Sequence, residues 1–229
     1  MSVNRSGRRE WLIPTGLVLL SLVPVVAGAV RVADLSAGAV ATPDNARFVA
    51  DPLPVLVHIV SATVYCLLGA FQFAPGFRRR RPGWHRAAGR LLVPAGIATG
   101  LSGVWMAVFY PLLPIDGGLL IGLRISFGAA MAACVVLGFV AIRRRDITRH
   151  RAWMIRGYAL GQGAGSQFLT HLFWILIVGP PGELARALLH AAGWLINLAV
   201  AEWVIRRPTR PVRVSPAPSG VDRSPVQPG

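Results

Sequence analysis

The fold is decided by an apolar run that ends in arginines: residues 119–142 read LLIGLRISFGAAMAACVVLGFVAI, and Arg143, Arg144 and Arg145 follow at once. A helix of this length spans the hydrocarbon core of a bilayer, which is about 30 Å thick. Comparable runs make up most of the rest of the chain, at residues 11–33, 53–74, 91–111, 154–178 and 184–205. The sequence therefore predicts an all-α integral membrane protein, a bundle of six transmembrane helices over residues 11–205.

The composition separates this chain from soluble and nucleic-acid-binding proteins. Of its 229 residues, 54% are hydrophobic and 14% are charged, whereas a soluble domain carries about a quarter charged residues. A net charge of +15 would also suit a nucleic-acid partner. The basic residues are all arginines, however, and most lie in the connections on one side of the bundle, as the positive-inside rule describes. We therefore expect a bacterial inner or plasma membrane location, both termini in the cytoplasm, and no nucleic-acid partner.

The two ends of the chain lie outside the predicted bundle. Residues 1–10 form a basic cytoplasmic N-terminus, and residues 206–229, rich in proline and arginine, are predicted to be a disordered cytoplasmic tail. The small residues at 27–29 and 39–41 would also suit signal-peptide cleavage. The apolar run before them is longer than the usual 7–15 residues of a signal peptide, so we expect the first helix to be retained.

Polar residues inside the apolar runs are the first candidate functional residues, because a polar side chain in lipid needs partners. Counted at about 1.5 Å per residue, four of them lie at a similar depth near the non-cytoplasmic side: His58, Arg124, His171 and His190. Imidazole is a common ligand of transition metals and of haem iron. We expect the three histidines to bind haem b or a transition metal for electron transfer. Arg124 would be the counter-charge, facing a haem propionate, a quinone oxygen or a lipid phosphate.

Two amides extend this set. Gln167 lies one helical turn before His171 on the same face, where its side chain would orient the second ring nitrogen and support cofactor binding. Asn197 lies two turns after His190. The alternatives are polar residues satisfied by backbone carbonyls, or a polar cluster without a cofactor, since equal depth does not show that side chains face one another.

A second candidate set lies in the arginine-rich connections, which we expect to be loops. Each connection has an arginine run, then His-Arg-Ala, then an arginine at the entry to the next helix; the residues are His85, Arg86, Arg90, His150, Arg151 and Arg156. They would hold an anionic headgroup or a phosphate, or serve only as determinants of topology. Glu202 is placed to pair with Arg206 at i+4 or with Arg156 across helices.

These connections also carry a resemblance. The segments His85-Arg86-x-x-Gly89-Arg90 and His150-Arg151-x-Trp153-Met-Ile-Arg156-x-Tyr158-Ala-Leu160 resemble those of a bacterial family of predicted membrane proteins, domain-of-unknown-function family 2306, over about residues 50–205. The resemblance implies the membrane architecture and draws attention to both segments. It implies no activity, because the family has none that is settled.

Three functions therefore stand after the sequence alone. The first is a membrane redox protein with haem b or a metal, served by a quinone or a membrane redox partner. The second is a non-enzymatic lipid-binding or assembly module that acts through the His-Arg connections. The third is a small-solute transporter in which residues 154–178 are flexible, because Gly157, Gly161 and Gly165 recur there every four residues; close helix packing is the simpler explanation of these glycines. Soluble-enzyme motifs such as the Walker sequence are absent, and enzymatic activity stays open.

Overall fold

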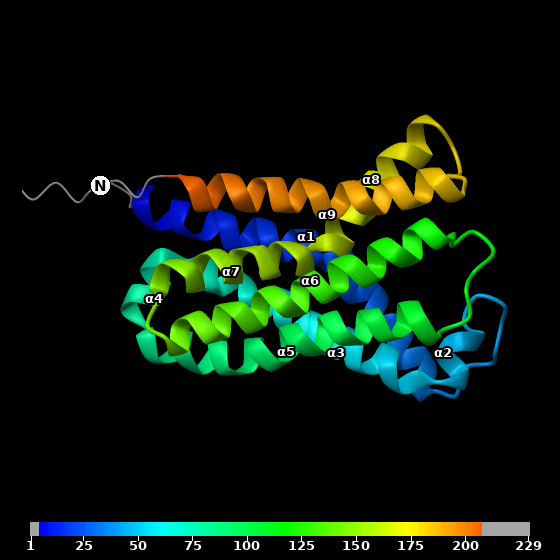
Figure 1. Ribbon diagram of the computed structural model, residues 1–229, viewed down its shortest axis with the longest axis horizontal. Helices are drawn as coiled ribbons and strands as arrows, with labels where there is room; N and C mark the ends of the chain where they lie inside the picture. The colour runs from blue at the N-terminus through cyan, green and yellow to red at the C-terminus, as the bar shows by residue number, and fades with distance from the viewer. Residues whose placement is uncertain (1–4, 208–229) are drawn as a thin grey trace, which may run out of the picture.

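Residues 5–207 are described by the computed structural model, and within them the chain forms helices and no strand (Figure 1). The elements are α1 (Arg5–Ser36), α2 (Ala46–Ala50), α3 (Pro52–Ala70), the 3-10 helix η1 (Phe71–Phe73), α4 (Pro75–Arg80), α5 (Pro82–Phe109), α6 (Gly118–Arg143), α7 (Ile147–Gly161), α8 (Gly163–Ile177) and α9 (Glu183–Arg206).

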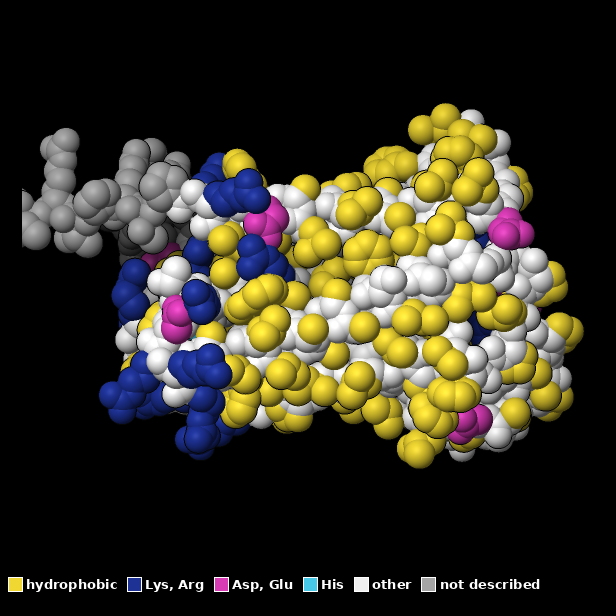
Figure 2. All heavy atoms as spheres, viewed as in Figure 1, with side chains coloured by type: hydrophobic (Ala, Val, Ile, Leu, Met, Phe, Trp, Pro, Cys, Tyr) yellow, Lys and Arg dark blue, Asp and Glu magenta, His cyan; other side chains and the backbone are white. Residues whose placement is uncertain are grey.

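Five segments of the described chain are long and apolar enough to cross a membrane: Glu10–Ser36, Pro52–Phe73, Pro82–Phe109, Gly118–Arg143 and Glu183–Arg206. Large apolar side chains such as Leu19, Leu101 and Ile196 are exposed on their outer surfaces, where lipid rather than water would cover them. Figure 2 shows apolar side chains along the bundle and arginines gathered at one end. This is the arrangement of a multi-pass membrane protein.

The bundle has two distinct ends. The arginine-rich end holds α4, the start of α5, the α6–α7 connection and the end of α9. The opposite end holds α2 and the connections 110–117 and 178–182.

The fifth predicted helix, 154–178, is divided into α7 and α8, which meet at Gln162. Glycines at 161, 163 and 165 flank this junction and lower its helix propensity. The same glycines allow close packing, because a Cβ atom on Gly163 would collide with the Trp194 ring and one on Gly165 with the backbone oxygen of Leu20. The break therefore lets α8 lie directly against both α1 and α9.

The predicted loops at the arginine-rich end are largely helical. His85 lies in the first turn of α5 and His150 in the first turn of α7. Pro82 starts α5 with a backbone angle that suits a first helical turn, and the Asp146 carboxylate caps α7 by accepting from the Arg149 backbone N–H at 2.9 Å. The other predicted bounds also shift: α1 already begins at Arg5 within the predicted N-terminal segment, α9 runs to Arg206, and residues 1–4 and 208–229 lie outside the described chain.

The core is built around Tyr65, whose side chain is 1% exposed. A Cβ atom on Gly96 would lie 2.6 Å from its ring, and one on Gly161 would lie 2.9 Å away. The glycine stripe of α7 and α8 is therefore packed against neighbouring helices, which confirms the packing interpretation. Across the bundle, the Arg156 guanidinium forms two hydrogen bonds to the Glu202 carboxylate, which also pairs with Arg206, so both predicted partners of Glu202 are confirmed.

Candidate functional site

A cavity of about 520 Å³ lies within the bundle between its middle and its opposite end. Cys66, Met131 and Leu160 lie at the mid-bundle part, and Tyr110 and Asp116 lie at the other, which we call the mouth. The walls are mostly apolar, from α1, α3, α5, α6, the α7–α8 junction and α9. A cavity of this size and character falls within the range of small-molecule and cofactor sites, about 300–1,000 Å³.

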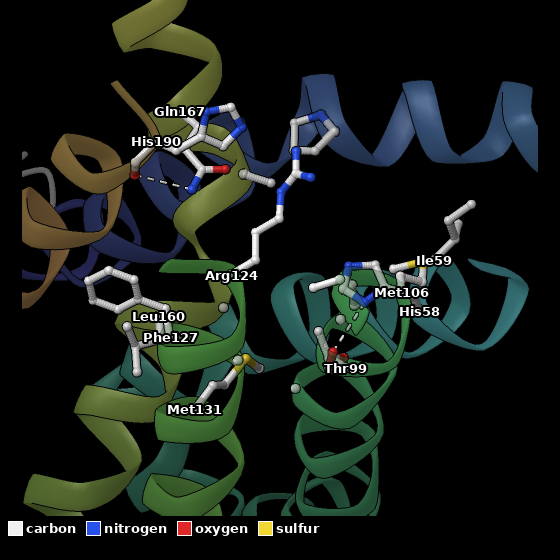
Figure 3. Close-up of a pocket in the computed structure, with 18 of the residues that line it drawn as sticks. His58, Ile59, Thr99, Met106, Arg124, Phe127, Met131, Leu160, Gln167 and His190 are labelled. Atoms are coloured by element: carbon white, nitrogen blue, oxygen red, sulfur yellow. Dashed lines mark hydrogen bonds between the residues drawn. The ribbon is translucent and has the colours of Figure 1, made fainter. Parts of the chain in front are cut away.

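Three of the residues predicted from their depth line this cavity, namely His58 on α3, Arg124 on α6 and His190 on α9, together with Gln167 on α8, which was predicted from its position one turn before His171. Figure 3 shows the Arg124 side chain extended between His190 on one side and His58 on the other. The structure thus places side chains from four separate helices around one space, which depth alone could not show.

Each of the two cavity histidines is held in place by hydrogen bonding at its ring nitrogen Nδ1. His58 Nδ1 lies 3.1 Å from the Thr99 backbone oxygen and 3.1 Å from Ser102 Oγ, and His190 Nδ1 lies 2.8 Å from the Arg186 backbone oxygen. Because a carbonyl oxygen only accepts, each Nδ1 is assigned the hydrogen, and Nε2 carries the lone pair. Neither Nε2 has a hydrogen-bond partner within residues 5–207.

His171 does not line the cavity. Its ring packs edge-on against the His190 ring, with 4.6 Å between the ring centroids and 84° between the planes. The Gln167 backbone oxygen, and not its side chain as predicted, lies 2.7 Å from His171 Nδ1. The Gln167 amide instead donates to the His190 backbone oxygen at 3.3 Å.

The three histidines do not form the predicted metal centre. Across the described residues, no group of three or more His, Cys, Asp or Glu side chains is placed to hold a metal ion. Asn197 likewise has a packing role, because it accepts from Ser166 Oγ at 2.7 Å and donates to the Ala159 backbone oxygen at 3.1 Å.

An ionic cluster at the mouth was not predicted. The Asp116 side chain is 1% exposed; its Oδ2 accepts from Arg124 at 2.8 Å, and its Oδ1 accepts from Arg186 at 2.8 Å. Burial acts to raise the pKa of Asp116, but the two arginine hydrogen bonds outweigh it and hold this pKa below its usual range. The available signal was an acidic residue, Asp116, in the connection just before the run that contains Arg124.

The six candidates at the arginine-rich end do not gather in one pocket. Arg156 faces Glu202 of α9, and Arg151 donates to the Val204 backbone oxygen at 3.4 Å. His150 Nδ1 lies 2.8 Å from the Gly138 backbone oxygen. The buried Nδ1 of His85 has no hydrogen-bond partner in the described chain. Arg90 is exposed on α5.

Comparison with known families adds to this description. Residues 55–205 match the family described as "Predicted membrane protein (DUF2306)". The chain belongs to this family. The matched part of this DUF2306 protein includes His58, both His-Arg segments and the α7–α8 junction, whereas α1 and Arg47 lie before it. No curated protein and no solved structure matches the chain.

Proposed function

We propose that this DUF2306 protein binds haem b in its cavity and serves in membrane electron transfer. The observation that supports this most is the state of His58 and His190: both line one cavity, each holds its Nδ1 against a backbone carbonyl, and neither Nε2 has a hydrogen-bond partner among the described residues. Iron-ligating histidines generally have this outer hydrogen bond, which fixes the tautomer and the ring orientation. When bound, haem supplies one-electron chemistry, and its potential is set by these ligands and by the apolar walls.

We further infer that the chain crosses the membrane six times, with α7 and α8 crossing as one unit and both termini in the cytoplasm. The arginines gathered at one end support this orientation. The mouth of the cavity then lies on the outer side, where a quinone or a membrane redox partner would exchange electrons. Labelling of single cysteines placed in residues 37–45 and 178–182, in intact cells, tests this orientation.

The haem assignment is tested by titrating haemin into the protein in nanodiscs and recording the Soret band. His58→Ala and His190→Ala should each weaken or remove the bound spectrum. His171→Ala is the matched control, because His171 touches His190 but does not line the cavity. Equal haemin binding by the His58→Ala/His190→Ala double variant and the unaltered protein would exclude the assignment.

A second candidate function, contact with anionic lipid at the arginine-rich end, is favoured by His85 in the first turn of α5, whose buried Nδ1 has no hydrogen-bond partner within residues 5–207 and which is followed by Arg86. Co-flotation with vesicles containing phosphatidylglycerol, compared with vesicles of phosphatidylcholine, tests it. Arg86→Ala should reduce the preference, whereas Arg149→Ala, an exposed arginine beside Asp146, should not.

A third candidate, transport of a small solute, is favoured by the helix break at the cavity, since discontinuous helices form the substrate sites of many transporters. Solute-dependent flux in proteoliposomes that falls when Gly161 is enlarged would support it.

A further inference from the structure

The cavity has an uncompensated positive charge at its mouth. Its lining includes three charged side chains: Arg47, Arg124 and Asp116. Arg124 is bound to one oxygen of Asp116, and the other oxygen is taken by Arg186, which does not line the cavity. Within residues 5–207, Arg47 forms no salt bridge. Arg124 was expected to pair with an acidic group of a ligand, but its charge is already paired with Asp116. Arg47 is therefore the cavity arginine that could pair with such a group.

Arg47 is held in place at this mouth by an aromatic ring. It lies on α2, and its guanidinium carbon is 4.7 Å from the centroid of the Phe48 ring, which also lines the cavity. The Arg31 guanidinium carbon is 5.0 Å from the same centroid. These cation–π contacts position both guanidinium groups but leave their charge uncancelled.

The surroundings of Arg47 disfavour its charge. Burial, followed by repulsion from Arg124, Arg186 and Arg31, lowers the pKa of Arg47, and only Asp116 acts in the opposite direction. A bound anion would relieve this repulsion. Most of the lining beyond Arg47, toward Met131 and Leu160, is apolar, so such an anion would need an apolar body.

We propose that the ligand of this cavity is an amphipathic carboxylate, whose acidic group pairs with Arg47 at the mouth while its apolar body lies along the walls toward mid-bundle. This rests on the proposed use of the cavity as a ligand site, and it adds the chemical class of the ligand. The planar guanidinium fork matches a carboxylate with two parallel hydrogen bonds. Haem with its propionates and a long-chain fatty acid share this chemistry, whereas a neutral quinone lacks the charge.

The test compares 11-(dansylamino)undecanoic acid with its methyl ester, because the ester removes the carboxylate charge and adds only one methyl group. The protein is placed in nanodiscs of phosphatidylcholine, and binding is followed by energy transfer from tryptophan to dansyl. Trp194 lines the cavity, so Trp194→Phe should lower the transfer if the probe lies there. We expect the acid to bind about tenfold more tightly than the ester, the value of one charge-assisted pair.

Arg47→Gln should remove this preference for the acid. Arg31→Gln is the matched control, because Arg31 contacts the same Phe48 ring but does not line the cavity. This variant should leave the preference for the acid unchanged. Circular dichroism and thermal unfolding of both variants show whether the bundle is intact.

Three results would overturn the proposal: equal affinity of the unaltered protein for acid and ester, no binding of either probe, or the same loss in Arg31→Gln and Arg47→Gln. The haem assignment fails separately. An acid preference that depends on Arg47, without any haemin binding, would retain the carboxylate class of ligand and exclude haem. Haemin binding without an acid preference would retain haem and exclude the pairing of a carboxylate with Arg47.

Discussion

The Gln162 amide nitrogen lies 2.7 Å from the Tyr158 hydroxyl and donates a hydrogen bond to it at the point where α7 ends. The Tyr158 hydroxyl in turn donates to the Cys66 backbone oxygen on α3 at 2.7 Å, and the Gln162 carbonyl accepts from Ser21 Oγ on α1 at 3.0 Å. One amide at the helix break thus joins α7 to α1 directly and to α3 through Tyr158. Because these residues lie in or beside the mid-bundle part of the cavity, the break between α7 and α8 is a fixed part of the site.

Replacing Gln162 with leucine should therefore reduce the free energy of unfolding by about 1–3 kcal/mol, since two hydrogen bonds of a buried amide are lost. Thermal unfolding in mild detergent measures this. Gln72→Leu is the matched control, because both polar atoms of the Gln72 amide are buried without a partner among residues 5–207, and leucine removes that cost. A larger loss at Gln72 than at Gln162 would contradict this explanation of the break.

Gly165 should not tolerate a methyl group. A Cβ atom there would collide with the Leu20 backbone oxygen, which cannot move aside as a flexible side chain can. We expect Gly165→Ala to lower the free energy of unfolding by about 1–3 kcal/mol through overpacking. In Gly122→Ala the new methyl group meets open space, so its higher helix propensity should leave stability unchanged or raise it. Thermal unfolding of both variants in one detergent decides the point, and equal unfolding temperatures would refute it.

The ionic cluster at the mouth should make stability depend on pH. The pKa of Asp116 is lower in the folded protein than in the unfolded chain, so its contribution is fully present above the unfolded pKa of about 3.9. It is lost as pH falls through the lower, folded pKa, because the carboxylate is then protonated in both states.

We therefore expect the unfolding temperature of the unaltered protein to exceed that of Asp116→Asn at pH 6–7, and the difference to shrink below about pH 4. Asp44→Asn, at an exposed position near the same end, is the control and should match the unaltered protein. A difference between Asp116→Asn and the unaltered protein that stayed constant down to pH 2 would show that Asp116 does not act through its charge.

Much of the fold follows from the length and spacing of the apolar runs. Five of the six predicted runs correspond to single long helices, because a run of about 20 apolar residues specifies both the helix and its lipid surroundings. The break at Gln162 was not predicted: glycines spaced four apart fit a continuous packed helix, and only the collisions at Gly163 and Gly165 show why α8 needs its own direction.

The candidate site was predictable in part, through depth. His58, Arg124 and His190 line one cavity as their depths suggested, but His171 at the same depth does not. The direction of a side chain around its helix depends on partner helices that one sequence does not specify. For the same reason the pairing of Asp116, in the connection before α6, with Arg186, in the first turn of α9, could not be predicted from the local sequence.

The proposed binding of haem b by His58 and His190 is tested most directly by the reduced-minus-oxidised visible spectrum of the protein, purified in mild detergent from haem-replete cells. We predict a Soret band with sharp α and β bands on reduction, retained in His171→Ala and lost in the His58→Ala/His190→Ala double variant. A colourless protein, or a haem spectrum that the double variant keeps, would contradict the claim.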